Sequence, residues 1–152
     1  MARKPENTFI DKVNDKLPIA KRKRSAKARE AHPGVQLHYE KNNNPFRGGT
    51  ADSWYSALPK DLWVEYKYIP RVPQRGVIKP LELLSSLQCE WLNGRLGEGR
   101  NVAVIIGCPI GGVVLTERAW EKELPVQEFL SLVRSVPDLA AWIAQNTFKT
   151  TR

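Results

Sequence analysis

Three residues, Asp52, Glu65 and Lys67, have the types and spacing that a hydrolytic metal site requires. Glu65 and Lys67 lie in residues 61–69, a stretch rich in Trp, Val and Tyr that predicts a strand. Because side chains alternate along a strand, Glu65 and Lys67 share one face. The apolar content of this strand predicts burial, and buried charges need partners or a metal.

Asp52 falls on the preceding predicted strand, residues 50–56, across a short turn. A cross-strand neighbour of Glu65 would lie there. Two carboxylates from adjacent strands suit Mg²⁺ or Mn²⁺, with water filling the remaining positions. The metal would polarise a phosphoryl oxygen and lower the pKa of a bound water. Lys67 would hold or activate that water and offset charge on the phosphorane, which predicts phosphodiester hydrolysis.

A simpler explanation is a same-face ion pair between Glu65 and Lys67 on a half-exposed strand. On spacing alone this explanation is favoured. The strand context, Gly48-Gly49 before Asp52, and a basic charge balance shift the interpretation towards the catalytic site.

The remaining elements form an order that could position these residues. A helix is predicted over 5–18, where Phe9, Val13 and Leu17 recur every four residues. Further strands are predicted at 35–41, 101–107 and 113–116, and helices at 80–96 and in the tail, at about 125–133 and 139–144. This order predicts an α/β sandwich with a mixed sheet.

Two polar residues on the predicted helices have alternative interpretations. Gln88 lies on the apolar stripe of the helix over 80–96, which indicates a buried hydrogen bond near the site or a place at the margin of the stripe. Glu6, in a first helical turn, either orients a metal or complements the helix dipole. We expect Trp54, Trp63 and Trp91 in the core, with base stacking less favoured.

Thr50-Ala51-Asp52, then twelve residues, then Glu65-Tyr66-Lys67 resembles the PD-(D/E)xK nuclease superfamily. The fuller stretches, 47–55 and 62–67, are similar to small phage-type nucleases of the VRR-NUC or Holliday-junction-resolvase kind. The resemblance spans residues 6 to about 115. It implies a restriction-endonuclease-like sandwich whose core runs helix-strand-strand-strand-helix-strand. The Pro of the motif is Ala51 here, a common replacement. The VRR triplet that names one branch is absent, so the resemblance indicates no single branch.

The resemblance also implies a ligand set and an activity. A divalent metal, Mg²⁺ with Mn²⁺ as a substitute, would be held by Asp52, Glu65 and the backbone carbonyl of Tyr66. Glu6 would supply a further acidic group, and Gln88 the glutamine that such nucleases often carry on the helix after the motif. The implied activity is that of a metal-dependent deoxyribonuclease, an endonuclease acting on DNA that could be branched or nicked, with RNA still open. A homodimer is compatible with this resemblance.

The charge distribution also favours a polyanionic partner. Net charge is +8, and residues 1–30 supply +6 of it. Such a basic run could follow phosphates, or be a solvated loop or an address signal. The candidate nucleic-acid contacts are Lys21, Arg22, Lys23, Arg24, Lys41, Arg47, Arg71 and Arg75.

We expect a single nuclease domain over 1–152, with a basic linker at about 19–33 and a C-terminal helical extension at about 118–152. No apolar run is long enough to span a bilayer, and the N-terminus lacks the apolar core of a secretory signal. We therefore expect a cytoplasmic protein without a membrane partner, in the host cytoplasm if a phage encodes it. Cys89 and Cys108 have no CxxC neighbours and are expected to be reduced thiols.

Two other classes of protein remain open. One is a non-catalytic nucleic-acid-binding or interaction protein on the same fold, and the other is a small basic structural protein. Only the enzyme needs Asp52 to bind a metal, so metal binding separates these classes.

Overall fold

A five-stranded mixed sheet forms the centre of the protein, as seen in a computed structural model that describes residues 4–19, 35–42 and 48–149. The sheet order is β1-β2-β3-β5-β6. β3 and β5 run parallel, and the other neighbours are antiparallel. The bounds of these strands are β1 His38–Lys41, β2 Ser53–Ser56, β3 Asp61–Tyr68, β5 Val102–Cys108 and β6 Gly111–Leu115.

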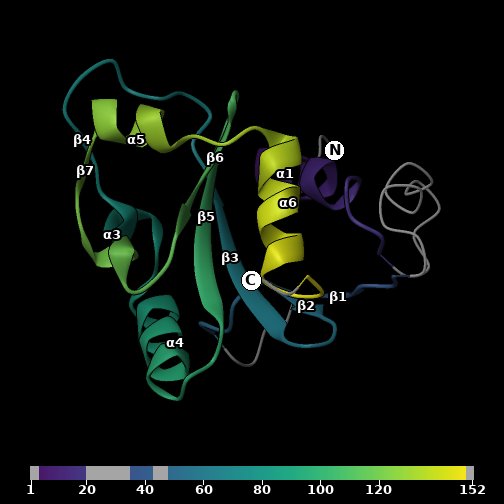
Figure 1. Cartoon of the computed structure of the whole chain (residues 1–152). Coiled ribbons are helices and arrows are strands. Elements are labelled where there is room, and N and C mark those ends of the chain that lie inside the picture. The colour runs from purple at the N-terminus through teal and green to yellow at the C-terminus, as the bar shows by residue number, and fades with distance from the viewer. Residues whose placement is uncertain (1–3, 20–34, 43–47, 150–152) are drawn as a thin grey trace.

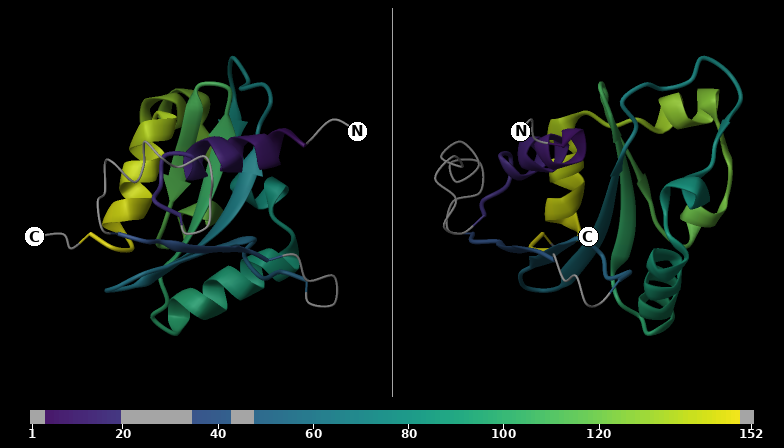
Figure 2. Two further views of the ribbon diagram at one scale, coloured as in Figure 1. Left: turned by 90° about the vertical axis from the view of Figure 1, so that its right-hand side faces the viewer. Right: turned by 180° about the vertical axis from the view of Figure 1, so that it is seen from behind.

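Helices cover both faces of this sheet (Figure 1). α1 (Pro5–Asn14) and α6 (Val136–Gln145) lie on one face. The other face carries α3, α4, α5, a short 3-10 helix and a small two-stranded sheet, and the view from behind in Figure 2 shows the same layers. Their bounds are α3 Pro80–Leu83, α4 Ser86–Gly97, η1 Ala119–Glu121, α5 Val126–Leu132, β4 Val77–Ile78 and β7 Leu124–Pro125. Within the described ranges no helix is both long and apolar enough to cross a bilayer.

β5 separates two hydrophobic layers. All seven of its residues are buried, as expected for a central strand covered on both faces. Ala103 and Ile105 pack with α1 and α6, whereas Val104 and Ile106 pack with the helices of the opposite face. Glu65 and Lys67 alternate with Val64 and Tyr66 along β3 in the same way, which places the two charged residues on the α4 side.

α1 packs closely against the sheet. Phe9, Val13 and Leu17 are buried, as their spacing predicts. A Cβ atom at Gly107 of β5 would lie 2.7 Å from the Phe9 ring, so only glycine allows this approach. The helix ends at Asn14 and not at the predicted position 18, because the following residues turn towards β1. There the N–H of Leu37 donates to the carbonyl of Pro18 at 2.9 Å.

The three predicted early strands are confirmed, but β1 and β2 are shorter than predicted. β2 begins at Ser53 and not at residue 50. Ahead of it, the side chain of Asn42 donates to the Ala51 carbonyl at 3.0 Å and its backbone N–H donates to the Asp52 carbonyl at 2.7 Å. These bonds fix the residues before β2 without extending the ladder.

The single helix predicted over 80–96 is wrong, because α3 ends at Leu83 and α4 begins at Ser86. Ser85 caps α4 in a capping box with Gln88. The sequence signal was present, since Ser followed three residues later by Gln marks a helix start. Leu81 of α3 is 47% exposed, so the apolar stripe of the predicted helix is not continuously buried. The segment between β3 and α3, where no strand was predicted, also contains β4, which pairs with β7.

The tail is helical as predicted, and its last helix contributes to the core. Leu139 and Ile143 of α6 are fully buried in the layer that also contains Val13 of α1. The order of helix, three strands, helix and strand agrees with the expected core, with α3 and the β4–β7 pair as additions. The predicted fold class, a mixed sheet flanked by helices, is confirmed.

Candidate active site

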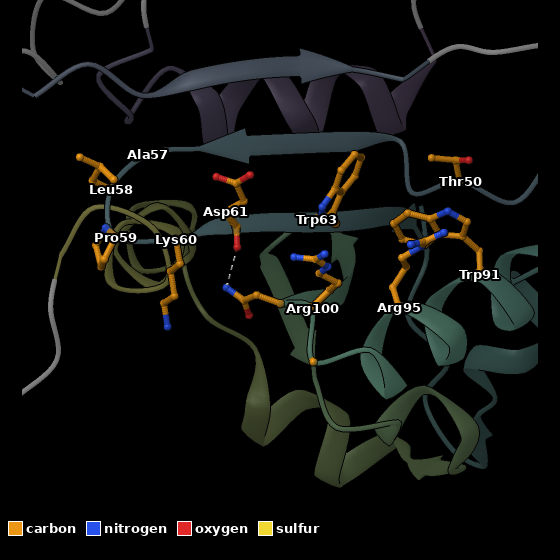
Figure 3. A pocket seen from close by; sticks show the side chains of 12 residues that line it. Thr50, Ala57, Leu58, Pro59, Lys60, Asp61, Trp63, Trp91, Arg95 and Arg100 are labelled. Atoms are coloured by element: carbon orange, nitrogen blue, oxygen red, sulfur yellow. Dashed lines mark hydrogen bonds between the residues drawn. The ribbon is translucent and has the colours of Figure 1, made fainter.

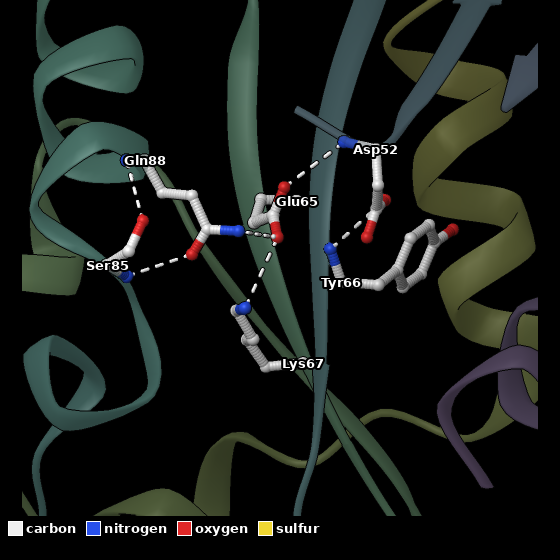
Figure 4. A network of polar contacts seen from close by, with 6 residues as sticks. All are labelled: Asp52, Glu65, Tyr66, Lys67, Ser85 and Gln88. Carbon is white, nitrogen blue, oxygen red and sulfur yellow. Dashed lines mark hydrogen bonds and ion pairs between the residues drawn. The ribbon is translucent and has the colours of Figure 1, made fainter. Parts of the chain in front are cut away.

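The candidate site lies just before the first residue of β2, where β3 continues past the β2–β3 ladder. Ser53 pairs with Val64, and that is the limit of the β2–β3 ladder on this side. Just beyond it, the backbone N–H of Asp52 donates to Oε2 of Glu65 at 3.1 Å. The backbone N–H of Tyr66 donates to Oδ1 of Asp52 at 3.4 Å. The Glu65 carboxylate is thus held by the backbone of Asp52, and the Asp52 carboxylate by the backbone of Tyr66, the residue after Glu65 (Figure 4).

Glu65 is only 2% exposed, and its carboxylate has three polar partners. In addition to the backbone of Asp52, Nε2 of Gln88 donates to Oε1 at 2.8 Å. Nζ of Lys67 lies 3.4 Å from the same oxygen. A buried carboxylate is tolerated only with such partners. The structure therefore brings Asp52, Glu65, Lys67 and Gln88 into one network.

The start of α4 fixes the orientation of Gln88. Its Oε1 accepts from the backbone N–H of Ser85 at 2.9 Å, while its own backbone N–H donates to Oγ of Ser85 at 3.1 Å. The amide oxygen is used by the helix cap, so the amide nitrogen points towards Glu65. One side chain therefore both begins a helix and holds a carboxylate.

Gly49 places the segment before Asp52 against α4. Its φ is +94°, a conformation that favours glycine. A Cβ atom there would lie 2.5 Å from the carbonyl oxygen of Leu87. Glycine thus allows the chain that leads to Asp52 to touch the helix that carries Gln88.

The two carboxylates share a desolvated site and repel each other. Burial, followed by the nearby charges of Glu65 and Glu6, raises the pKa of Asp52 to about 8. Burial also raises the pKa of Glu65 to about 7, although Lys67 acts to lower it. A divalent cation would offset both the desolvation and the repulsion, so the charge state of the site is suited to one.

The donor set fits a hard, oxygen-binding ion. Asp52 and Glu65 supply carboxylate oxygens. In a strand, the N–H and C=O groups of one residue point to the same edge of that strand. The Tyr66 N–H points towards Asp52, so the Tyr66 carbonyl points towards Asp52 as well. In the part of the chain that the structure describes, no three His, Cys, Asp or Glu side chains form a metal site by themselves. The candidate metal ligands are therefore the carboxylates of Asp52 and Glu65 and the carbonyl of Tyr66. Hard divalent cations complete their coordination shell with water.

Glu6 lies near this set but outside its hydrogen-bond network. Burial raises its pKa, and Lys67 and Lys41 act to lower it. Its charge also contributes to the raised pKa values of Asp52 and Glu65. Lys41 is held beside it by a hydrogen bond to Oδ1 of Asn7. Glu6 thus acts on the two carboxylates through its charge.

Among the predicted nucleic-acid contacts, the structure describes Lys41, Arg71 and Arg75. Arg71 and Arg75 are exposed in the loop between β3 and β4. Lys41 is exposed at the end of β1. Outside the described residues lie Lys21, Arg22, Lys23, Arg24 and Arg47.

A chain of buried hydroxyls behind β3 was not predicted. The Tyr55 hydroxyl donates to Oδ1 of Asn14 at 2.7 Å, so the Tyr66 hydroxyl, also at 2.7 Å, donates to Tyr55. Burial raises the pKa of Tyr66 strongly. The chain anchors the residue whose backbone lies between Glu65 and Lys67. Alternation along the strand could have placed Tyr66 on the far face, but the end of the hydroxyl chain at Asn14 of α1 is a long-range contact.

Comparison with known proteins identifies no family. No family model matches the chain, and no curated protein matches it. One similar solved structure is the 1.6 Å structure of Hjc, a Holliday junction resolvase from the archaeal hyperthermophile Archaeoglobus fulgidus. The identity is 18% and the TM-score 0.41, over 68% of this chain and 88% of that chain.

Proposed function

We propose that this protein is a metal-dependent nuclease that hydrolyses phosphodiester bonds in DNA, including branched or nicked DNA. The proposed catalytic group is Asp52, Glu65 and Lys67, with Gln88 and Glu6 in support. The observation that carries the proposal is the pair of desolvated carboxylates with a lysine 3.4 Å from one of them. A purely structural ion pair between Glu65 and Lys67 would not need a second buried carboxylate, and the burial of Asp52 beside Glu65 raises the pKa of Asp52.

Asp52, Glu65 and the Tyr66 carbonyl would hold Mg²⁺, or Mn²⁺ in its place. When bound, the ion polarises a phosphoryl oxygen and lowers the pKa of a water. Glu65 keeps its orientation because Gln88 and the Asp52 backbone occupy fixed positions around it. Asp52 is oriented by the Tyr66 N–H.

Lys67 is the proposed group nearest the reacting phosphate. Its side chain is 19% exposed, so its ammonium can reach both Glu65 and a bound substrate. It holds the attacking water and offsets negative charge on the phosphorane as the water adds. Because Glu65 is fixed by other donors as well, Lys67 can turn towards substrate without leaving that carboxylate unpaired.

The proposal is tested by cleavage of linear duplex, single-stranded, nicked and four-way-junction DNA, each with Mg²⁺, Mn²⁺ or EDTA. Wild type is compared with Lys67→Ala and with Lys122→Ala, which removes the same charge from an exposed position. We expect metal-dependent cutting that is lost in Lys67→Ala and kept in Lys122→Ala. The substrate cut fastest identifies the preferred DNA shape.

Absence of cutting by folded wild type on every substrate would contradict the enzyme. If that protein still bound DNA, it would be the non-catalytic nucleic-acid-binding protein on the same fold. Cutting that persists in EDTA would contradict the role given to Asp52 and Glu65.

A further inference from the structure

A groove of about 790 Å³ lies beside the carboxylates on the same face of the sheet. Trp63 lines it and is two positions before Glu65 on the same face of β3, a distance of about 6.6 Å along the strand. Thr50, two positions before Asp52, also lines it. Figure 3 shows side chains from β3, α4 and the segment before β5 around this hollow. The groove therefore reaches to within two residues of Glu65 and of Asp52 along the chain, on the same face of β3 as Glu65.

Two tryptophans form a corner in this groove. Trp63 and Trp91 are both partly exposed, and their rings meet at 65° with centroids 5.4 Å apart. Trp54 stacks on Trp63 at 5.4 Å and supports it from β2. The sequence suggested core positions for these residues, but the structure leaves part of Trp63 and Trp91 open to the groove. A flat aromatic molecule could lie against one ring and touch the other.

The charges around this corner are mainly positive. Lys60, Arg95 and Arg100 line the groove and are exposed. Arg95 lies over the Trp91 ring at 5.8 Å and pairs with Glu98. Among the described residues, Lys60 and Arg100 make no ion pair, and Figure 3 shows Arg100 below Trp63. Asp61 is the one carboxylate among the described lining residues, and it already accepts from Ser56 and Trp54.

We propose that this groove binds an unpaired segment of the nucleic-acid substrate, next to the phosphate to be cut. A base would stack in the corner of Trp63 and Trp91, and its phosphates would contact Arg100 and Lys60. A paired base cannot do this, because neighbouring pairs cover both of its faces. Aromatic platforms with cations are the usual means of holding single strands. The inference extends the proposed nuclease function by naming the substrate feature, an unpaired nucleotide.

The test is binding in EDTA, which does not depend on hydrolysis. A labelled oligothymidylate and a duplex of equal length are titrated with wild type, and anisotropy and tryptophan fluorescence are recorded. We expect tighter binding of the single strand, with quenching of tryptophan emission. Trp91→Ala should weaken single-strand binding by about 5- to 100-fold and reduce the quenching.

Trp91→Phe keeps an aromatic ring, so its affinity for the single strand should lie between those of wild type and Trp91→Ala. This variant also serves as a control for a folding defect in Trp91→Ala. Arg100 is exposed, and Arg100→Ala should make the dependence of log K on log salt less steep, by about 0.7 in the magnitude of the slope. Lys122→Ala removes the same charge outside the groove and should bind as wild type does. The groove proposal would be overturned if Trp91→Phe and Arg100→Ala both bound the single strand as wild type does. It would also be overturned if wild type bound the duplex as tightly as the single strand. The cleavage results would stand unchanged in that case.

Discussion

Among the individual residues, Gln88 links local structure to the chemistry. Its amide oxygen completes the cap of α4, and its amide nitrogen donates to Glu65 at 2.8 Å. Removing this donor leaves Glu65 held by Lys67 and one backbone N–H. Gln88 is therefore a positioning residue for the carboxylate.

Gln88→Ala should lower kcat, or raise the Mg²⁺ concentration needed, by about 10- to 100-fold. The reason is that Glu65 loses a fixed hydrogen bond. Steady-state cleavage over a range of Mg²⁺ concentrations measures the effect. Ser85→Ala is the control, because it removes the cap at a cost of about 1 kcal/mol but leaves the Gln88–Glu65 bond available. Equal losses in both variants would mean that Gln88 matters only for the helix.

The two raised pKa values predict a pH-dependent stability. In the folded protein the pKa is about 8 for Asp52 and about 7 for Glu65, above their ordinary values of 3.8 and 4.5. A carboxyl group with a raised folded-state pKa favours folding below its unfolded-state pKa. That contribution is lost as pH rises through the folded-state pKa.

The free energy of unfolding of the metal-free protein should therefore fall between about pH 4 and pH 8, by up to about 1.4 kcal/mol per pH unit for each group. Asp52→Asn has no titrating group at this position, so its free energy of unfolding should fall less with rising pH than that of wild type. Urea denaturation in EDTA across this pH range measures it, with the exposed Glu90→Gln as control. A wild-type curve as flat as that of Asp52→Asn would contradict the raised pKa values.

Among the elements, the packing of the segment before β2 against α4 determines the geometry of the site. Gly49 touches the carbonyl of Leu87 one residue before Gln88, while Asp52 follows three residues after Gly49. The two sides of the site are thus held together where these two backbones meet.

Gly49→Ala should destabilise the protein by about 2 kcal/mol or more and impair cleavage, because its φ is positive and no room exists for Cβ. Gly94→Ala is the matched control. It lies within α4, and a Cβ there meets nothing within 4 Å, so alanine should stabilise by about 0.5–1 kcal/mol. Thermal unfolding of both variants measures the difference. A Gly49→Ala protein as stable as wild type would contradict this packing.

The sequence was sufficient for the features that depend on local periodicity. Alternation alone placed Glu65 and Lys67 on one face of a strand, and four-residue spacing identified the buried face of α1. The capping box at Ser85 marked the break before α4, but the apolar stripe favoured one continuous helix over 80–96. The approach of Gly49 to Leu87 and the Trp63–Trp91 corner join distant segments, so no local pattern could predict them.

For the whole molecule, the charge distribution predicts how substrate affinity depends on salt. The basic linker at about 19–33 carries much of the positive charge and lies outside the described residues except at Ile19. Its binding to phosphates stays a prediction, as does the homodimer.

Replacement of Lys21, Arg22, Lys23 and Arg24 by alanine should weaken duplex binding at low salt. The dependence of log K on log salt should become less steep, by about 0.9 in the magnitude of the slope for each phosphate that the variant no longer neutralises. Anisotropy titrations at several salt concentrations measure the slope. Cleavage at saturating substrate should persist, because Asp52, Glu65 and Lys67 are unchanged in this variant. An unchanged slope would mean that the run does not bind DNA.

The most direct test of the account is Mn²⁺ binding at pH 8, measured by calorimetry on wild type, Asp52→Asn and Lys67→Ala. Asp52 and Glu65 are proposed as ligands, and Lys67 as a group that acts on water and phosphate. We therefore expect wild type and Lys67→Ala to bind Mn²⁺, and Asp52→Asn to lose most of the affinity. Folded wild type that binds no Mn²⁺, or Asp52→Asn that binds it as wild type does, would contradict the account.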